Sequence, residues 1–204
     1  MTVQGSVMYS ERLKESKPTG VRQKVKYCSN CGSKLSHRIP EKDDRPRFVC
    51  DVCEIVHYEN PKMVVGTLPV WDHSILFCRR AIEPRYRKWT IPAGFLENGE
   101  TLEEGARRET YEEAGAKLGE LEPYGIFNLS FINQVYLIFR GPLRNTSFNV
   151  GSESLEVRLF EEHELPWDDL AFPVIRKTLQ HYFDDLKNGV FSLHIGDIRP
   201  EAGS

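Results

Sequence analysis

The sequence predicts an α+β fold, in which helices pack on the faces of a mixed sheet, preceded by a small cysteine-rich module. Three observations support this prediction. Strand patterns outnumber helix patterns along residues 61–187, four of the five cysteines fall in two pairs before residue 54, and hydrophobic residues make up 40% of the chain. The length of 204 residues exceeds the roughly 150 residues of one domain, so we expect one domain plus a small module.

The formal net charge of −3 is unevenly distributed. Residues 1–47 contain 11 Lys and Arg against 5 Asp and Glu, whereas residues 48–204 contain 16 against 25. A basic N-terminal part can bind polyanions, and an acidic remainder can bind cations. The simpler interpretation, which we favour, is a solvated tail joined to an acidic folded body.

The first 27 residues are polar, and we expect a flexible extension over residues 1–27. They lack an apolar core, so we expect neither a secretory nor a transit signal. No stretch of the chain approaches the roughly 20 apolar residues that a membrane helix needs. These observations predict a cytoplasmic protein without a membrane partner.

Four cysteines form two pairs, Cys28-x2-Cys31 and Cys50-x2-Cys53, separated by 18 residues. Two such turns that face each other complete a tetrahedral shell of four thiolates, which is the geometry of structural zinc. The spacing therefore predicts a zinc ribbon over residues 28–60 that folds only with its structural Zn2+ bound. Two disulfides or a redox pair are the alternatives, disfavoured by the absence of a signal peptide and of a strand–helix context.

Other residues near these pairs have simpler interpretations. Asn30 and Gly32 suit a tight turn, because both accept positive φ. His57 follows the second pair, but four thiolates already complete the shell, so we interpret it as a surface histidine. The fifth cysteine, Cys78, lies in a strand pattern and is interpreted as a small core residue rather than a nucleophile.

Residues 61–187 show the periodicities of a mixed sheet. Apolar runs predict strands at residues 63–70, 74–78, 121–129, 134–139 and 155–160. Residues 71–73 separate the first two strands and predict a hairpin, and residues 81–92 contain two prolines and predict an ordered loop. We expect residues 188–204 to form a C-terminal tail.

Two helices are predicted in the same region. The first runs from Glu100 to Ala114, with Thr101 or Asn98 as its N-cap and Gly115 as its stop signal. The second runs over residues 172–187. The order of strands and helices indicates a sheet that is covered by helices on its faces.

Seven glutamates lie in one stretch: Glu97, Glu100, Glu103, Glu104, Glu109, Glu112 and Glu113. In a helix, Glu109 and Glu113 share a face, and Glu112 lies one i,i+3 step from Glu109. Three carboxylates at this spacing repel one another unless a cation lies among them, and hard oxygen ligands favour Mg2+ or Mn2+. A solvated acidic face is the alternative, and we favour it for Glu103 and Glu104 in the first turn.

The longer string Gly94-x5-Glu100-x7-Arg108-Glu109-Thr110-x-Glu112-Glu113-x-Gly115-Ala116 resembles the Nudix box, G-x5-E-x7-R-E-U-x-E-E-x-G-U, in which U is aliphatic. Every glycine, arginine and glutamate of the box is present. Thr110 and the small Ala116 depart from it, at positions that pack the helix on the sheet. With the cysteine pairs in front, the resemblance covers residues 28–186 and indicates the zinc-ribbon-bearing Nudix subgroup. It implies a Nudix α/β/α sandwich over residues 61–187 and a homodimer.

The resemblance implies a role for each matching residue. Glu109 and Glu113 would be the principal ligands of Mg2+ or Mn2+, and Glu112 would be a third ligand or the group that activates water. The backbone carbonyl near Ala93 would supply a further ligand.

Other residues would orient the box or complete the chemistry. Gly94, Glu100 and Arg108 match positions that orient the box, and an arginine beside carboxylates can fix their geometry by bidentate bonding. In some Nudix proteins the general base lies outside the box, on a loop before a later strand. Glu153 is our preferred candidate for this base, and Glu156 is the second.

The resemblance implies metal-dependent hydrolysis of the diphosphate linkage in a nucleoside diphosphate derivative. FAD or ADP-ribose, with release of AMP, is the expected small-molecule substrate, because residues 133–136 and 153–160 resemble FAD and ADP-ribose diphosphatases. The S-Q-P-W-P-F-P-x-S string of NADH pyrophosphatases is absent, which disfavours NADH. The proline expected of ADP-ribose pyrophosphatases is also absent, and Ile132 stands near its place.

Alternatives remain open at this point. NADH or a dinucleoside polyphosphate could be the substrate, or the protein could be a nucleotide-sensing or nucleic-acid-binding zinc-ribbon protein without catalysis. The ribbon lacks the interleaved aromatic and basic residues of RNA-binding modules, so we do not expect nucleic acid as the partner.

Six side chains outside the box could contact such a substrate: Arg79, Arg80, Arg85, Tyr86, Trp89 and Phe127. The aromatic rings could stack on the substrate, and the arginines could bind the diphosphate. Core packing is the favoured alternative for the aromatic rings, and a solvated surface is an equal alternative for the arginines.

Overall fold

The computed structural model describes residues 25–200, so nearly all of the expected N-terminal extension lies outside the described residues. The chain divides into two compact units, of which the first ends at His57 and the second begins at Tyr58. Among the described helices, none is long and apolar enough to cross a membrane.

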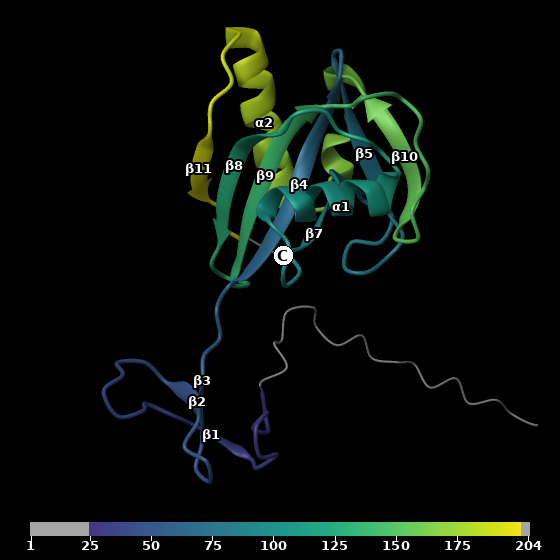
Figure 1. Ribbon diagram of the computed structural model, residues 1–204. Helices are drawn as coiled ribbons and strands as arrows, with labels where there is room; N and C mark the ends of the chain where they lie inside the picture. The colour runs from purple at the N-terminus through teal and green to yellow at the C-terminus, as the bar shows by residue number, and fades with distance from the viewer. Residues whose placement is uncertain (1–24, 201–204) are drawn as a thin grey trace, which may run out of the picture. The chain divides into compact units, whose positions relative to one another are not determined.

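The N-terminal unit is built on a small antiparallel sheet (Figure 1). Its strands lie in the order β1 (Leu35–Arg38), β2 (Arg47–Cys50) and β3 (Val56–His57). Strands of four residues or fewer bury little apolar surface, and a unit of this size usually needs a metal or a disulfide for stability.

The second unit contains one mixed sheet (Figure 1). Its strands lie in the order β10 (Ser154–Phe160), β5 (Ser74–Arg80), β4 (Lys62–Trp71), β9 (Gln134–Pro142), β8 (Glu122–Leu129) and β11 (His194–Asp197). β6 (Trp89–Thr90) pairs with β5, and β7 (Ala93–Phe95) pairs with β4. β4 runs parallel to β9 and forms the predicted hairpin with β5, in which Val70 faces Ile75. The mixed sheet predicted from the sequence is confirmed.

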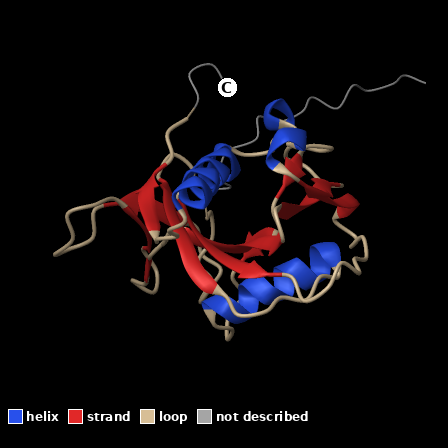
Figure 2. Ribbon diagram, turned by 90° about the horizontal axis from the view of Figure 1, so that it is seen from above, coloured by secondary structure: helices blue, strands red, loops and turns tan. Residues whose placement is uncertain are grey.

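Helices α1 (Leu102–Ala114) and α2 (Pro173–Asn188) lie on opposite faces of this sheet (Figure 2). Side chains along β4 alternate between the faces: Val65 belongs to the apolar cluster under α1, whereas Val64 and Leu68 belong to the cluster under α2. Two short 3-10 helices, η1 (Glu162–Glu164) and η2 (Trp167–Asp169), connect β10 to α2. The predicted α/β/α sandwich is confirmed.

Three short strands of the second unit were not predicted from the sequence. β6 lies at the end of residues 81–92, which were expected to form a loop, and β7 follows it directly. β11 lies within residues 188–204, which were expected to form a tail, and it pairs in parallel with β8. Elements of two to four residues show no period in the sequence, because their backbone pairing depends on a sheet edge formed elsewhere in the chain.

A buried carboxylate connects β11 to α2. Asp185 Oδ2 accepts a hydrogen bond from the Tyr124 hydroxyl (2.9 Å) and lies 2.8 Å from His194 Nε2. The His194 ring stacks on His181, with the ring centroids 3.9 Å apart. Burial raises the pKa of Asp185, but the hydrogen bonds from His194 and Tyr124 outweigh this effect and hold the pKa below its usual value. The carboxylate is therefore ionised at neutral pH and fastens the last strand to the helix.

Replacing Asp185 with Asn is expected to lower the free energy of unfolding by about 2 kcal/mol, because buried hydrogen bonds to a charged acceptor are weakened. The lowered pKa means that this contribution is present above the ordinary Asp pKa and is lost as pH falls through the folded-state pKa, so the difference from the parent should shrink in acid. Asp184→Asn, at the exposed neighbouring position, is the matched control and should change stability by less than about 0.5 kcal/mol. Urea unfolding at neutral and acidic pH measures these differences, and equal midpoints for the two variants at neutral pH would contradict the prediction.

Candidate active site

Helix α1 carries the acidic box residues, and local hydrogen bonds fix both of its ends. The Thr101 hydroxyl accepts a hydrogen bond from the Glu104 N–H (3.2 Å), and the Thr101 N–H donates to the Glu104 carboxylate (2.8 Å), which together form a capping box. At the other end, Gly115 has a φ of 61°, and its N–H donates to the Tyr111 carbonyl. Thr101 is therefore the N-cap, and the predicted stop at Gly115 is confirmed.

The glycine that opens the box lies directly under a glutamate. A Cβ atom at Gly94 would stand 2.2 to 2.3 Å from the carboxylate atoms of Glu109. Gly94 lies on β7 and pairs with Val65 of β4. The absence of a side chain therefore lets the Glu109 carboxylate rest on the strand backbone, and any larger residue would displace it.

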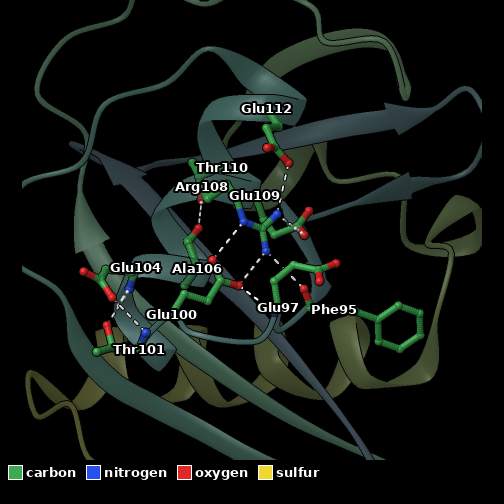
Figure 3. Close-up of polar contacts among 10 residues, drawn as sticks. All are labelled: Phe95, Glu97, Glu100, Thr101, Glu104, Ala106, Arg108, Glu109, Thr110 and Glu112. Carbon is green, nitrogen blue, oxygen red and sulfur yellow. Dashed lines mark hydrogen bonds and ion pairs between the residues drawn. The ribbon is translucent and has the colours of Figure 1, made fainter.

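Arg108 binds three of the box glutamates (Figure 3). Its Nε and Nη2 atoms donate to the two Glu100 oxygens at 3.0 and 2.7 Å, and Nη1 donates to Glu109 (2.7 Å) and Glu112 (3.0 Å). Nη2 also donates to the Phe95 carbonyl (3.1 Å). The hydrogen bonds from Arg108 are the largest cause that lowers the pKa of Glu100 to about 2. Arg108 therefore links α1 to the loop that precedes it and sets the direction of two candidate ligands.

Glu113 is the box glutamate that Arg108 does not contact. It is only 7% exposed, and its Oε2 has no hydrogen-bond partner. Burial, together with the charge of Glu109, raises the pKa of Glu113 to about 8, although Arg80 and the Ala93 N–H act in the opposite direction. Burial also raises the pKa of Glu109. At these two neighbouring carboxyl groups, burial and the charges of nearby glutamates therefore outweigh the positive charges of Arg80 and Arg108.

These residues fit a hard divalent cation. The donors are carboxylate oxygens, one of them is buried without a partner, and burial, together with the charges of neighbouring glutamates, raises the pKa values of Glu109 and Glu113. Glu109 and Glu112 would exchange a contact with Arg108 for the cation. Glu113 Oε2 has no such contact to lose.

The raised pKa of Glu113 predicts that Mg2+ stabilises the protein more strongly as pH rises. In the metal-free protein, a raised carboxyl pKa contributes stability that is fully present below the ordinary pKa of 4.5 and is lost as pH rises to about 8. This loss amounts to at most about 1.4 kcal/mol per pH unit. A cation that replaces the proton on Glu113 restores the stability that deprotonation removes. The rise in Tm on adding Mg2+ should therefore become larger as pH increases from 4.5 to about 8. Thermal unfolding with and without Mg2+ measures it, and a rise that is independent of pH would contradict the prediction.

The two candidates for the general base differ in their surroundings. Glu153 is exposed, and its negative charge contributes to the raised pKa values of Glu109 and Glu113, which places it near them. Glu156 lies on β10 and forms an ion pair with Arg79 of β5 (3.6 Å). The structure therefore brings Glu153 to the carboxylates and engages Glu156 elsewhere.

Arg80 also lies beside the carboxylates. Its charge lowers the pKa of Glu113 and that of Tyr136. Arg80 Nε donates to the Pro84 carbonyl (3.0 Å), and its guanidinium carbon lies 5.2 Å from the centre of the Phe172 ring. Because that hydrogen bond uses one of its five N–H groups, Arg80 can still bind an anion.

The other candidate arginines and Tyr86 are placed differently. Arg79 Nε donates to the Arg87 carbonyl (3.0 Å), and Arg79 also pairs with Glu156. Arg85 and Tyr86 are exposed on the loop between β5 and β6, where Arg85 and Arg87 adopt positive φ. This loop leaves the Tyr86 ring accessible.

Three other side chains are buried. Trp89 is 7% exposed and packs edge-on against Phe160, and Phe127 is 1% exposed and lies parallel to His181. Trp89 and Phe127 therefore pack in the core, as the favoured interpretation of these rings predicted, and the suggestion that they stack on a substrate is wrong. Cys78 is 1% exposed, and burial raises its thiol pKa far above the usual value, which confirms it as a core residue.

The four paired cysteines come together in the N-terminal unit. Their Sγ atoms all lie within 4.8 Å of one another, with Cys28–Cys53 at 3.5 Å and Cys31–Cys50 at 3.4 Å, and none forms a disulfide. Zinc–sulfur bonds of about 2.3 Å in a tetrahedron place the sulfurs about 3.8 Å apart, whereas disulfide sulfurs lie about 2 Å apart. The cluster fits a structural Zn2+.

The turns of the ribbon explain this arrangement. Gly32 has the expected positive φ of 72°, and in the second turn Glu54, with a φ of 59°, takes the same conformation. The Asn30 N–H donates to Cys28 Sγ (3.4 Å), and the His57 side chain lies beside Cys28. The expectation that His57 is a surface residue is therefore wrong: it is half-buried against a thiol that the sequence places 29 positions away.

The fold and the site define a class of protein: an α/β/α sandwich whose first helix carries glutamates that fit a divalent cation, preceded by a four-cysteine ribbon. A model of the NUDIX domain family matches residues 60–182, and a model of the Nudix N-terminal zinc ribbon matches residues 26–59. The chain belongs to the Nudix hydrolase family.

Several known proteins resemble this chain. A crystal structure of a NUDIX hydrolase from Nitrosomonas europaea is 48% identical, with a TM-score of 0.81, and covers 86% of this chain and 100% of that one. Nudix hydrolase 19, chloroplastic, of Arabidopsis thaliana is 31% identical over 74% of this chain and 36% of its own length. The NAD-capped RNA hydrolase NudC of Vibrio atlanticus is 26% identical over 81% of this chain and 60% of its own length. The chain thus spans less than two thirds of the length of these two curated relatives.

Proposed function

We propose that the protein hydrolyses the diphosphate linkage of a nucleoside diphosphate derivative and requires Mg2+ or Mn2+. The observation that carries this proposal is the buried Glu113 oxygen without a partner, next to Glu109, on a helix that matches the Nudix box. Membership of the Nudix hydrolase family supports the same reaction class.

When bound, the divalent ion would withdraw charge from the diphosphate and lower the pKa of a water molecule. Glu109, Glu112 and Glu113 would hold the ion, with the backbone carbonyl near Ala93 as a further donor. Arg108 would keep Glu109 and Glu112 oriented until the ion displaces it. The structural Zn2+ would lie in the separate ribbon and take no part in the reaction.

Two residues outside the box would act on the substrate and on water. Arg80 lies beside the carboxylates, and its guanidinium would bind the diphosphate oxygens, which suits its planar set of donors. Glu153 is exposed near the same carboxylates and would accept the proton of the attacking water, with Glu112 as the alternative.

Glu153→Gln is expected to lower kcat by about 100-fold while leaving the concentration of Mg2+ that gives half-maximal activity unchanged. Glu156→Gln is the matched control, since Glu156 is paired with Arg79, and should change kcat by less than about threefold. Steady-state kinetics across Mg2+ concentrations measure both values. Equal effects of the two substitutions would contradict the assignment of Glu153 as the base.

FAD or ADP-ribose, with release of AMP, is the substrate that we propose. The strings at residues 133–136 and 153–160 support this choice, and the accessible Tyr86 ring is available for stacking. The NudC relatives support a second candidate, a nicotinamide dinucleotide, either free or as the cap of an RNA.

The experiment that tests the function is incubation with FAD, ADP-ribose, NADH, a diadenosine polyphosphate and NAD-capped RNA, each with Mg2+ or Mn2+, followed by chromatography for AMP or the decapped RNA. We expect cleavage of FAD or ADP-ribose. No cleavage of any compound, with uncapped RNA retarded on a gel, would instead support a nucleic-acid-binding ribbon protein. Light scattering tests the homodimer that we propose from the resemblance.

A further inference from the structure

Thr110 is a box residue that departs from the Nudix pattern, and its hydroxyl has a specific partner. Thr110 is fully buried, and its Oγ1 donates to the Ala106 carbonyl one turn earlier (2.8 Å). The same Oγ1 lies 2.7 Å from Oγ1 of Thr67 on β4, which is also fully buried. Because the Thr110 proton is used at Ala106, the Thr67 hydroxyl is the donor to Thr110. A directed chain of hydrogen bonds therefore joins the sheet to α1.

Small residues surround this contact. A Cβ at Gly105 would lie 3.0 Å from Val65 Cγ2, and one at Gly66 would lie 2.5 Å from the Ala93 Cβ. Ala106 is fully buried in the apolar cluster under α1, which also contains Val65. At this close approach of Gly and Ala few side chains interlock, so apolar packing at this point constrains only weakly how far the helix slides or rotates on the strand. A directional hydrogen bond between two buried hydroxyls does fix it.

Thr67 also holds the other part of the candidate cation site. Its backbone N–H donates to the Pro92 carbonyl (3.0 Å), directly before β7. The next residues of β7 are Ala93, whose N–H lies close enough to Glu113 to lower the pKa of its carboxyl group, and Gly94, on which the Glu109 carboxylate rests. One residue thus connects the helix that carries the ligands to the strand against which they lie.

We propose that Thr67 is a positioning residue for cation binding. It acts through Thr110 and Pro92, and it sets the position of Glu109 and Glu113 relative to β7. This inference rests on the proposed function, since it assumes that these glutamates bind the cation.

The test is a measurement of Mn2+ binding to the full-length protein, without substrate, in which electron paramagnetic resonance reports the free and bound Mn2+. Thr67→Val and Thr110→Val keep the shape of the side chain and remove the hydroxyl. Each is expected to weaken Mn2+ binding by about tenfold, as is typical for residues that support metal ligands. The double variant should resemble the single variants, because all three lack the same contact. Thr67→Ser, which keeps the hydroxyl, should bind Mn2+ like the parent.

Thr178→Val is the matched control. Thr178 lies on α2, is fully buried, and donates to the Val174 carbonyl one turn earlier (2.9 Å), so its removal costs a similar buried hydrogen bond on the opposite face of the sheet. It should lower the melting temperature without changing Mn2+ binding. If the Thr67 and Thr110 variants also lose only thermal stability and bind Mn2+ like the parent, the proposal is overturned.

The failure of this inference is distinguishable from failure of the proposed function. A parent protein that binds no Mn2+ and cleaves no nucleotide would contradict both the proposed function and the role of Thr67. A parent that binds Mn2+ and cleaves its substrate, while Thr67→Val does so with equal Mn2+ affinity, would sink the role of Thr67 alone. Should Thr110→Val fail to fold, Thr67→Val decides the question, because the Thr110 hydroxyl keeps its partner at Ala106 in that variant.

Discussion

Glu113→Gln is expected to lower kcat/KM for the cleaved nucleotide by about 1,000-fold, with the fold intact. The amide keeps the shape of the side chain and can still accept from the Ala93 N–H, but it cannot give an anionic oxygen to a cation that stabilises charge in the transition state. The measurement is steady-state hydrolysis at saturating Mg2+. Glu103→Gln is the matched control, since Glu103 is an exposed glutamate of the same helix paired with Arg107, and its activity should stay within about twofold of the parent.

The same substitution has a second expected effect, on stability without metal. At pH 8 the parent has lost most of the stability that the protonated Glu113 carboxyl contributes at low pH. Gln has no proton to lose, so its contribution does not change with pH. Glu113→Gln should therefore be more stable than the parent at pH 8, by as much as about 4 kcal/mol. Its melting temperature should no longer rise with Mg2+ in a pH-dependent way. An inactive Glu113→Gln whose melting still responds to Mg2+ as the parent does would contradict the role of Glu113 as a ligand.

Cys50→Ser is expected to release the ribbon's zinc and to unfold the N-terminal unit. Cys50 is fully buried, with its Sγ 3.4 Å from that of Cys31, and few apolar side chains of this unit are buried with it. Binding of a structural zinc is worth about 10 kcal/mol or more, which a sheet this small cannot replace. We expect the metal content to fall from one zinc per chain to none, and amide hydrogen exchange to become fast across β1, β2 and β3.

Cys78→Ala provides the control for Cys50→Ser. It also removes one thiol, but Cys78 lies in the core under α1, outside the ribbon. It should keep one zinc per chain and slow exchange in the ribbon. Retained zinc and unchanged exchange in Cys50→Ser would show that the cysteines do not form a metal site.

Features that depend on neighbouring residues were predictable from the sequence. The Thr101 cap and the Gly115 stop follow from residues within one helical turn, and so does the shared face of Glu109 and Glu113. Each cysteine pair was predictable for the same reason, because it forms a single turn, whereas the two pairs meet through the pairing of β1 with β2. In such cases the spacing along the chain fixes the geometry with little help from tertiary structure.

Features that join distant segments were not predictable. The proximity of Arg80 to Glu113 arises because β5 passes beneath the end of α1, and the contact of His57 with Cys28 arises from pairing of β3 with β2. The inward direction of the Trp89 and Phe127 side chains depends on which face of each strand the core covers. A one-residue change of register would have turned both rings to the opposite face of the sheet, and no pattern in a two-residue strand such as β6 specifies this register.

The hydrogen bonds of Arg108 affect how the protein folds in the absence of a divalent cation. The Arg108 guanidinium partly neutralises Glu109 and Glu112. The acidic helix α1 can therefore pack against the sheet during folding without a bound cation. Binding of a divalent cation at the proposed site would then replace one positive partner of these carboxylates with another. Competition with Arg108 would weaken cation binding, so the occupancy of the site would depend on the cation concentration around the protein.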